Sequence, residues 1–131
     1  MKKMNKIRQK VRTLIKERGK LEKENLGVRD MVKGTVVEHY KKCGGNCVCR
    51  EGKLHGPYWY LSYKEGERSR LKYIHVKELS TVKRLAGNYK TFQSNLTRIS
   101  RINKEIISLM GQIRQLQIDQ VSKKIIKGKG C

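Results

Sequence analysis

Acidic residues are scarce in this sequence: eleven Asp and Glu, scattered along the chain, stand against 32 Lys and Arg among 131 residues. A two-metal nuclease site needs several carboxylates close together, so the composition disfavours that class. The glycines at positions 44 and 45 lack the downstream Lys-Ser or Lys-Thr of a phosphate-binding loop. Cysteine–histidine catalysis needs an activated thiolate, whereas clustered cysteines favour metal binding. We therefore expect neither an enzyme nor a small-molecule substrate.

Long apolar segments are also missing. No stretch approaches the roughly 18 apolar residues of a membrane-spanning helix. The basic residues from Met1 to Lys6 are not followed by the apolar core of an export signal. We therefore expect a cytoplasmic protein, or a nuclear one in a eukaryote, that is nucleoid-associated if it binds DNA and makes no membrane contact. Cysteines stay reduced in such compartments, which favours metal binding over disulfides.

Positive charge is what the sequence has in abundance. The net charge is +21, and residues 1–24, 41–84 and 85–131 each carry +7 of it, so the charge is not confined to a tail. Such an excess opposes compaction by self-repulsion, and a polyanion such as DNA or RNA relieves the repulsion. The composition therefore predicts nucleic-acid binding, with a solvated basic surface or an anionic membrane as less favoured interpretations.

Two segments have the apolar spacing of helices. In residues 2–24 the apolar stripe is broken by Arg18. From about residue 77 to residue 126, steps of three and four form a heptad pattern typical of coiled coils, with Asn103 at one core position. Gly87 and Gly111 leave open a division into two helices. The apolar residues of the long pattern are Val82, Leu85, Tyr89, Phe92, Leu96, Ile99, Ile106, Met110 and Ile113.

Three short segments between these helices have the composition of strands: residues 34–40, 58–64 and 70–76. They predict a three-stranded antiparallel sheet, with residues 41–57 as a loop that holds the only proline. The fold class is therefore α+β. The expected regions are a basic amphipathic helix (1–26), the cysteine loop and sheet (31–77), a long helix for packing and dimerisation (78–126), and a flexible basic tail (127–131).

Three cysteines and one histidine form the candidate metal site. Cys43, Cys47 and Cys49 have the spacing C-x3-C-x-C, and His55 follows six residues later. Thiolates and an imidazole suit a tetrahedral zinc ion, and four protein ligands would make the site structural. Zinc would hold a loop that has little apolar content of its own. His39 or water are alternative fourth ligands, and reduced cysteines without metal are the competing interpretation.

The expected nucleic-acid surface combines aromatic and basic residues. Trp59, Leu61 and Tyr63 share one strand face and are expected in the core, while the other face can present rings to bases or sugars. A two-stranded ribbon can also enter the major groove. We favour duplex DNA read with low base specificity, as by a regulator or architectural factor; an RNA-binding or ribosome-associated protein and a coiled-coil adaptor are alternatives. The expected phosphate contacts are Lys6, Lys10, Lys16, Arg50, Arg68, Arg70, Lys72 and Lys83.

The lengths of the two predicted helices differ. At 1.5 Å per residue the first spans about 35 Å and the second about 75 Å, so the first can cover about half of the heptad seam. The part from Ile106 to Val121 then needs another partner, which predicts a homodimer; a frayed or nucleic-acid-bound helix is the alternative. The expected dimerisation residues are Ile99, Asn103, Ile106, Met110 and Ile113.

The stretch from Met31 to Tyr40, the cysteine loop and the run from His55 to Ser62 (HGPYWYLS) together carry a family resemblance. They resemble a family of small uncharacterised bacterial and archaeal proteins with a strand, a Cys-rich turn, a basic hairpin and a long C-terminal helix bearing an Asn-Tyr pair like Asn88-Tyr89. The resemblance covers about residues 31–110 and leaves the first helix outside. It implies a fold more than an activity, and because members often belong to mobile elements or phages, it favours DNA.

Overall fold

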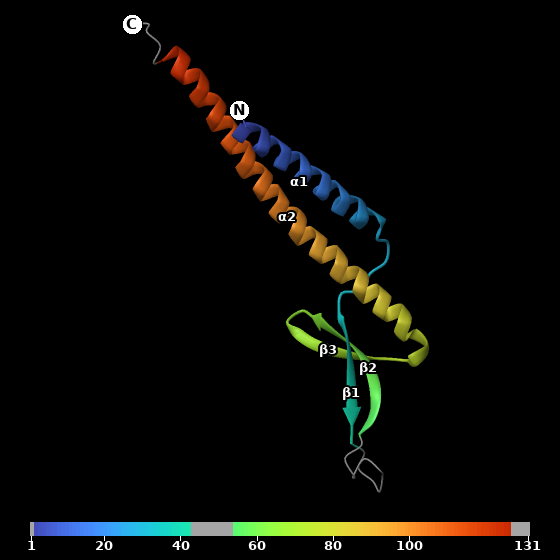
Figure 1. Ribbon diagram of the computed structural model, residues 1–131. Helices are drawn as coiled ribbons and strands as arrows, with labels where there is room; N and C mark the ends of the chain where they lie inside the picture. The colour runs from blue at the N-terminus through green and yellow to red at the C-terminus, as the bar shows by residue number, and fades with distance from the viewer. Residues whose placement is uncertain (1, 43–53, 127–131) are drawn as a thin grey trace. The chain divides into compact units, whose positions relative to one another are not determined.

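The computed structural model describes residues 2–42 and 54–126, and its element order is helix, three strands, helix (Figure 1). The elements are α1 (Lys2–Gly27), β1 (Thr35–Lys41), β2 (His55–Glu65), β3 (Arg68–Ile74) and α2 (Val76–Ile125). The α+β class and the three-stranded antiparallel sheet are confirmed. Helix α2 runs unbroken through Gly87 and Gly111, and β2 begins at His55, three residues earlier than predicted.

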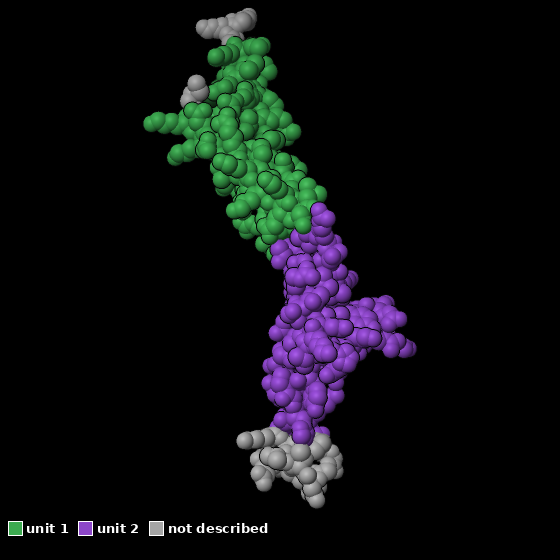
Figure 2. Space-filling view, turned by 90° about the vertical axis from the view of Figure 1, so that its right-hand side faces the viewer, with its two compact units in different colours: residues 1–27, 94–131 green, residues 28–93 purple. Residues whose placement is uncertain are grey.

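The chain divides into two compact units (Figure 2). The helical unit comprises residues 1–27 and 94–131, and the sheet unit comprises residues 28–93. The last part of α2 therefore belongs to the helical unit and its first part to the sheet unit.

The helical unit has an apolar core between α1 and the last part of α2. Ile7 and Val11 of α1 pack with Ile102, Ile106 and Leu109 of α2. Around this cluster lie the half-buried side chains of Leu14, Leu21, Ile113 and Leu116. Because apolar residues recur every three or four positions in both segments, each helix turns one apolar stripe towards the other.

The core stripe of α2 coincides with the predicted seam only in part, at Ile106 and Ile113. Leu96 of the predicted seam is 45% exposed, whereas Ile102 and Leu109, which lie outside it, are 4% and 8% exposed. The seam prediction was wrong at Leu96, Ile102 and Leu109 because α2 has apolar residues on neighbouring stripes, and spacing alone does not choose between them. The contacts with α1 run along α2 from Asn95 to Leu116, so they include Ile106 and Ile113, which the length argument had left for another partner.

Polar pairs join the two helices along the same seam. The Asn95 side-chain amide donates to Oδ1 of Asn25 at 2.9 Å, and both residues are buried. Arg18, which interrupts the α1 stripe, donates to Oδ1 of Asn103, which interrupts the α2 pattern, at 2.9 Å. The two irregularities of the sequence are therefore partners, and they fix which turn of α1 meets which turn of α2.

At the edges of this seam are ion pairs. The Arg98 guanidinium donates through Nε to Oε1 of Glu17 at 2.7 Å, and its Nη2 contacts the same oxygen. Lys10 Nζ lies 3.2 Å from Glu105 Oε1. These groups are largely exposed, so each pair adds little stability, but all of them agree with the register set by the buried asparagines.

The sheet unit packs one face of its sheet against the first part of α2. Cross-strand partners share a face, so the pairing of Glu38, Trp59 and Ile74 defines this side. Ile74 is buried, as is Ala86 of α2, and the Lys83 ammonium lies 4.4 Å from the centre of the Trp59 ring. The sequence expectation that the Trp59 face packs inward agrees with this arrangement.

The segment between α1 and β1 is fastened to α2 by two hydrogen bonds. The Val32 amide donates to the Leu85 carbonyl at 3.1 Å, and the Asn88 side chain donates to the Asp30 carbonyl at 2.9 Å. These bonds fix the point at which β1 begins.

Gly56 allows β1 and β2 to approach closely where their register shifts. Its φ is +145°, and a Cβ there would lie 2.8 Å from the His39 carbonyl oxygen and 2.9 Å from the Tyr40 ring. The register shift lies between His39 and Lys41, opposite Gly56. A larger residue would therefore be strained in conformation and would also collide with β1.

Candidate nucleic-acid interface

The sheet face opposite Trp59 carries a row of aromatic side chains from all three strands. His39 of β1 lies 5.1 Å from Tyr60 of β2, Tyr60 lies 5.7 Å from Tyr73 of β3, and Tyr73 lies 5.1 Å from His75, all between ring centres. Residues two apart on a strand, or directly opposite on neighbouring strands, point to the same side, which explains why these four rings meet. We call this set the aromatic row and its side of the sheet the open face.

Lys41 adds a cation to one end of the aromatic row. Its ammonium donates to the Tyr60 hydroxyl at 2.6 Å and lies 5.1 Å from the centre of that ring and 5.6 Å from the centre of the Tyr58 ring. The hydrogen bond to Tyr60 raises the pKa of Lys41 above its ordinary value. Sequence reasoning missed Lys41 because it ended the strand at Tyr40. Lys41 lies two residues after His39, and this spacing could have placed both side chains on the same face of a longer strand.

The open face is exposed to solvent along much of its length. Tyr73 is 45% exposed, and Tyr58 and Leu71, which point to the same side, are exposed as well. His39 and Tyr60 are half-buried. A sheet that leaves several large rings accessible beside a fixed ammonium can stack planar groups and hold negative charge next to them.

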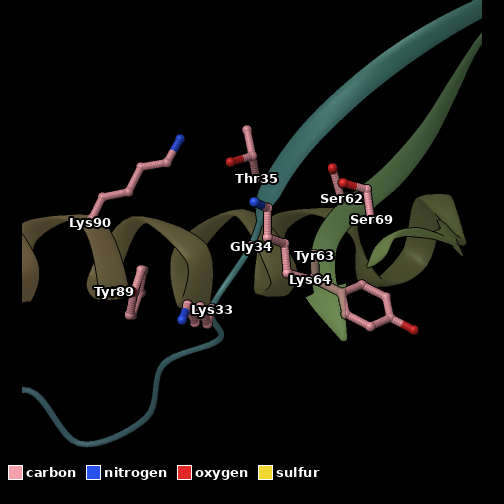
Figure 3. A pocket seen from close by; sticks show the side chains of 9 residues that line it. All are labelled: Lys33, Gly34, Thr35, Ser62, Tyr63, Lys64, Ser69, Tyr89 and Lys90. Atoms are coloured by element: carbon pink, nitrogen blue, oxygen red, sulfur yellow. The ribbon is translucent and has the colours of Figure 1, made fainter. Parts of the chain in front are cut away.

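Beyond the aromatic row, a pocket of about 300 Å³ lies where β1 begins (Figure 3). Thr35, Ser62 and Ser69 contribute hydroxyl groups from the three strands. Lys33, Lys64 and Lys90 contribute ammonium groups from the segment before β1, from β2 and from α2. Gly34 forms part of the wall, since a Cβ there would lie 2.8 Å from Leu61 Cδ1. Among the described residues, no Asp or Glu lines this pocket.

The residues predicted to contact phosphate do not form one surface within either unit. Arg68, Arg70 and Lys72 are exposed on β3, but they point to the side of Trp59 and not to the open face, and Arg70 pairs with Glu65 at 3.4 Å. Lys83 lies over the Trp59 ring. Lys6, Lys10 and Lys16 are exposed in the helical unit. Arg50 lies outside the described residues.

The predicted zinc ligands are only partly within the described chain. Cys43, Cys47 and Cys49 lie outside it. His55 is the first residue of β2 and pairs with Lys41, while the alternative ligand His39 belongs to the aromatic row. Among residues 2–42 and 54–126, no group of three or more His, Cys, Asp or Glu side chains could hold a metal ion. Zinc binding therefore stays a prediction.

The residues expected to mediate dimerisation mostly face α1. Ile106 is buried in the helical core and Ile113 packs against it, while Asn103 accepts the hydrogen bond from Arg18. Ile99 is half-buried, and Met110 is exposed. Other exposed apolar side chains of α2 are Ile107, Ile118, Val121 and Ile125.

Comparison with known proteins identifies a family. The family described as a domain of unknown function (DUF6788) matches residues 4–84, which is more than half of the chain. The match includes α1, which the family resemblance had left outside. No curated protein and no solved structure matches this chain. Within the part of the chain that the structure describes, neither helix has the length and apolar character needed to span a membrane.

Proposed function

The chain belongs to this uncharacterised family, and we propose that it is a nucleic-acid-binding protein, not an enzyme, with low base specificity. The observation that carries the proposal is the aromatic row with Lys41 on the open face of a chain whose net charge is +21. Rings that are accessible beside a fixed ammonium supply stacking and phosphate attraction together, which is the combination that binds nucleic acid without reading base edges.

The geometry favours unpaired strands of DNA or RNA over the duplex DNA favoured by the sequence. Stacking on Tyr60 or Tyr73 requires a base whose flat face is free, and a base within a duplex exposes only its edges in the grooves. Accordingly, the open face is suited to single-stranded segments, loops or ends. The aromatic side chains recognise the planar face of any base, which supports low specificity.

Duplex DNA remains the second candidate because of β3. Arg68, Arg70 and Lys72 are exposed on one side of the β2–β3 ribbon, and a two-stranded ribbon fits the major groove. In this mode the ribbon would contact phosphates through the side opposite the aromatic row. The two candidates therefore use opposite faces of the same sheet, and substitutions on each face separate them.

The experiment compares wild-type protein with Tyr73→Leu, using labelled single-stranded DNA, single-stranded RNA and duplex DNA over a salt series. Loss of one stacking ring should weaken single-strand binding by about fivefold to about 150-fold. The slope of log affinity against log salt should not change, because the phosphate contacts remain. Tyr40→Leu is the matched control, since Tyr40 is an exposed β1 tyrosine outside the aromatic row.

Several outcomes would overturn the proposal. A wild-type protein whose affinity does not depend on salt, or that binds none of the three probes, is not a nucleic-acid-binding protein. Equal binding by Tyr73→Leu and wild type, with Arg70→Gln weakening duplex binding, would favour the second candidate. A folded state equal to that of wild type, checked by circular dichroism, is required for each variant.

Zinc binding and homodimerisation stay predictions, and each is tested by a separate measurement. Native mass spectrometry should give one zinc ion per chain, and Cys47→Ser should remove it. Sedimentation equilibrium should give a dimer that Met110→Lys dissociates; because α1 covers Ile106 and Ile113, the exposed residues Ile107 and Met110 are the ones available for such a contact. A metal-free wild-type protein, or a monomer at micromolar concentration, would contradict the respective prediction.

A further inference from the structure

The residues that line the pocket beside the open face are suited to binding an anion. Lys33, Lys64 and Lys90 line it from three different elements, together with Thr35, Ser62 and Ser69. No carboxylate lines it, and within the described residues none of the three lysines is paired with an acidic group. Three like charges around one hollow repel one another, and an anion in the hollow would relieve that repulsion.

The lysines come from parts of the backbone that are held in place. Lys33 follows Val32, whose amide is bonded to the Leu85 carbonyl of α2. Lys90 lies two residues after Asn88, whose side chain is bonded to the Asp30 carbonyl. These two bonds tie the segment that carries Lys33 to the helix that carries Lys90, so the two lysines are brought to the pocket by the fold. In Figure 3 the ammonium of Lys90 extends from α2 alongside Thr35.

Phosphate is the anion that this set of donors suits. Lysine ammonium groups act as point charges for phosphate oxygens, and serine and threonine hydroxyls are common additional donors. The volume of about 300 Å³ lies at the small end of the range of ligand pockets, which suits a phosphate with part of its sugar better than a large cofactor.

The pocket lies in line with the aromatic row. Ser62 is two residues from Tyr60 on β2, and Thr35 is two residues from Val37, the β1 partner of Tyr60. Two residues of a strand span roughly 6.6 Å, and side chains two apart point to the same face. A nucleic-acid strand stacked on Tyr60 and Tyr73 would therefore need to extend only a short way along the open face to reach the pocket.

We propose that this pocket binds a backbone phosphate of the same unpaired strand whose bases stack on the aromatic row. The inference rests on the proposed function, since it assigns the pocket to the nucleic acid bound by the open face. The pocket fixes the position of the strand along the sheet, while the rings hold its bases. Free phosphate offers the same chemistry without a strand and is the alternative source that the experiment has to separate.

The test removes two of the pocket charges in Lys64→Gln/Lys90→Gln. The control is Lys104→Gln/Lys123→Gln, which removes the same net charge from exposed positions of α2 in the helical unit. The probe is a single-stranded oligothymidylate over a salt series. The pocket variant should bind roughly five- to tenfold more weakly at about 50–100 mM salt, and its salt slope should be smaller by about 0.7, as expected for one lost phosphate of a single strand.

A second arm uses inorganic phosphate and follows the amide resonances of Ser62 and Ser69 in the wild-type protein and the pocket variant. Phosphate-dependent shifts that the variant loses, together with the reduced salt slope, support the proposal. Shifts without any difference in strand binding between the pocket variant and the control overturn it, because the pocket then takes free phosphate only. Equal strand binding by the two variants without any shift overturns it as well.

Failure of the pocket and failure of the proposed function give different results. If Tyr73→Leu weakens strand binding while the pocket variant behaves like its control, the open face binds nucleic acid and the pocket inference is wrong. If wild-type protein binds no single strand, the proposed function itself is wrong, and the pocket inference falls with it.

Discussion

The two units of this protein differ in how many apolar residues they bury. The helical unit buries Met4, Ile7, Val11, Ile102, Ile106 and Leu109, whereas among its described residues the sheet unit buries only Ile74 and Ala86 of its apolar side chains. The sheet unit instead leaves Tyr58, Leu71 and Tyr73 exposed on the open face. Apolar area that stays in water stabilises nothing until a ligand covers it. The difference assigns stability mainly to the helical unit and leaves the sheet unit equipped for binding.

The largest effect should come from the neighbouring residues Ile106 and Ile107. Ile106 is 5% exposed and Ile107 is 70% exposed, so truncation to alanine removes the same atoms from very different surroundings. Ile106→Ala should lower the free energy of unfolding by about 2–5 kcal/mol, because it leaves a cavity in the core cluster. Ile107→Ala should change it by less than about 0.5 kcal/mol. Urea denaturation measures both, and equal losses would contradict the assignment of the core.

Next in size is the loss of the buried asparagine pair. Asn95→Ala removes the donor that Oδ1 of Asn25 accepts, and it should cost about 1–3 kcal/mol because a buried acceptor loses its partner. The double variant Asn25→Leu/Asn95→Leu should lose less than the sum of the single leucine substitutions, since both polar groups then disappear together. Additive losses in this double-mutant cycle would mean that the two side chains act independently.

Comparable in size, but located in the sheet unit, is the effect of Gly56→Ala. The added Cβ meets the His39 carbonyl oxygen at 2.8 Å in a backbone conformation that L residues rarely adopt, so a loss of about 1–3 kcal/mol is expected. It should also weaken strand binding, because β1 carries His39 and Lys41 of the open face.

The smallest change in stability should come from Gly87→Ala, and it should be an increase. This substitution is the control for Gly56→Ala. Gly87 lies within α2, and nothing lies within 4 Å of a Cβ built there. Gly87→Ala should therefore stabilise the protein by about 0.5–1 kcal/mol through its greater helix propensity, without changing nucleic-acid affinity. Thermal unfolding measured by circular dichroism checks the sign; a destabilised Gly87→Ala would show that this position has packing demands that the structure lacks.

The sequence was informative where a residue pattern is compatible with only one local structure. The helices and strands follow from apolar spacing and from β-branched and aromatic content, and the inward face of the sheet follows from the alternation around Trp59. The seam of α2 followed at Ile106 and Ile113 but not at Leu109, since Leu109 and Met110 offer adjacent apolar stripes and only α1 selects between them. The pairing of Arg18 with Asn103 joins positions 85 residues apart, which no local pattern reveals.

The candidate site was predicted in part for similar reasons. Aromatic rings on the sheet were expected from β2, but Lys41 was assigned to a loop because glycine and proline follow it. The basic residues of β3 were expected to surround the rings; their spacing from Tyr73 by odd numbers of residues already places them on the other face. The pocket lysines were missed because they come from three separate elements and have no shared motif.

The division of the helical unit across the chain has a consequence for how the protein is made. The residues that pack against Ile7 follow it by about a hundred positions, and the whole sheet unit is encoded between them. At the usual synthesis rate of about 5–20 residues per second, α1 waits on the order of ten seconds on the ribosome before Ile106 and Leu109 are translated. The sheet unit is complete by then. During that interval the apolar stripe of α1 lacks the residues that cover it in the folded helical unit.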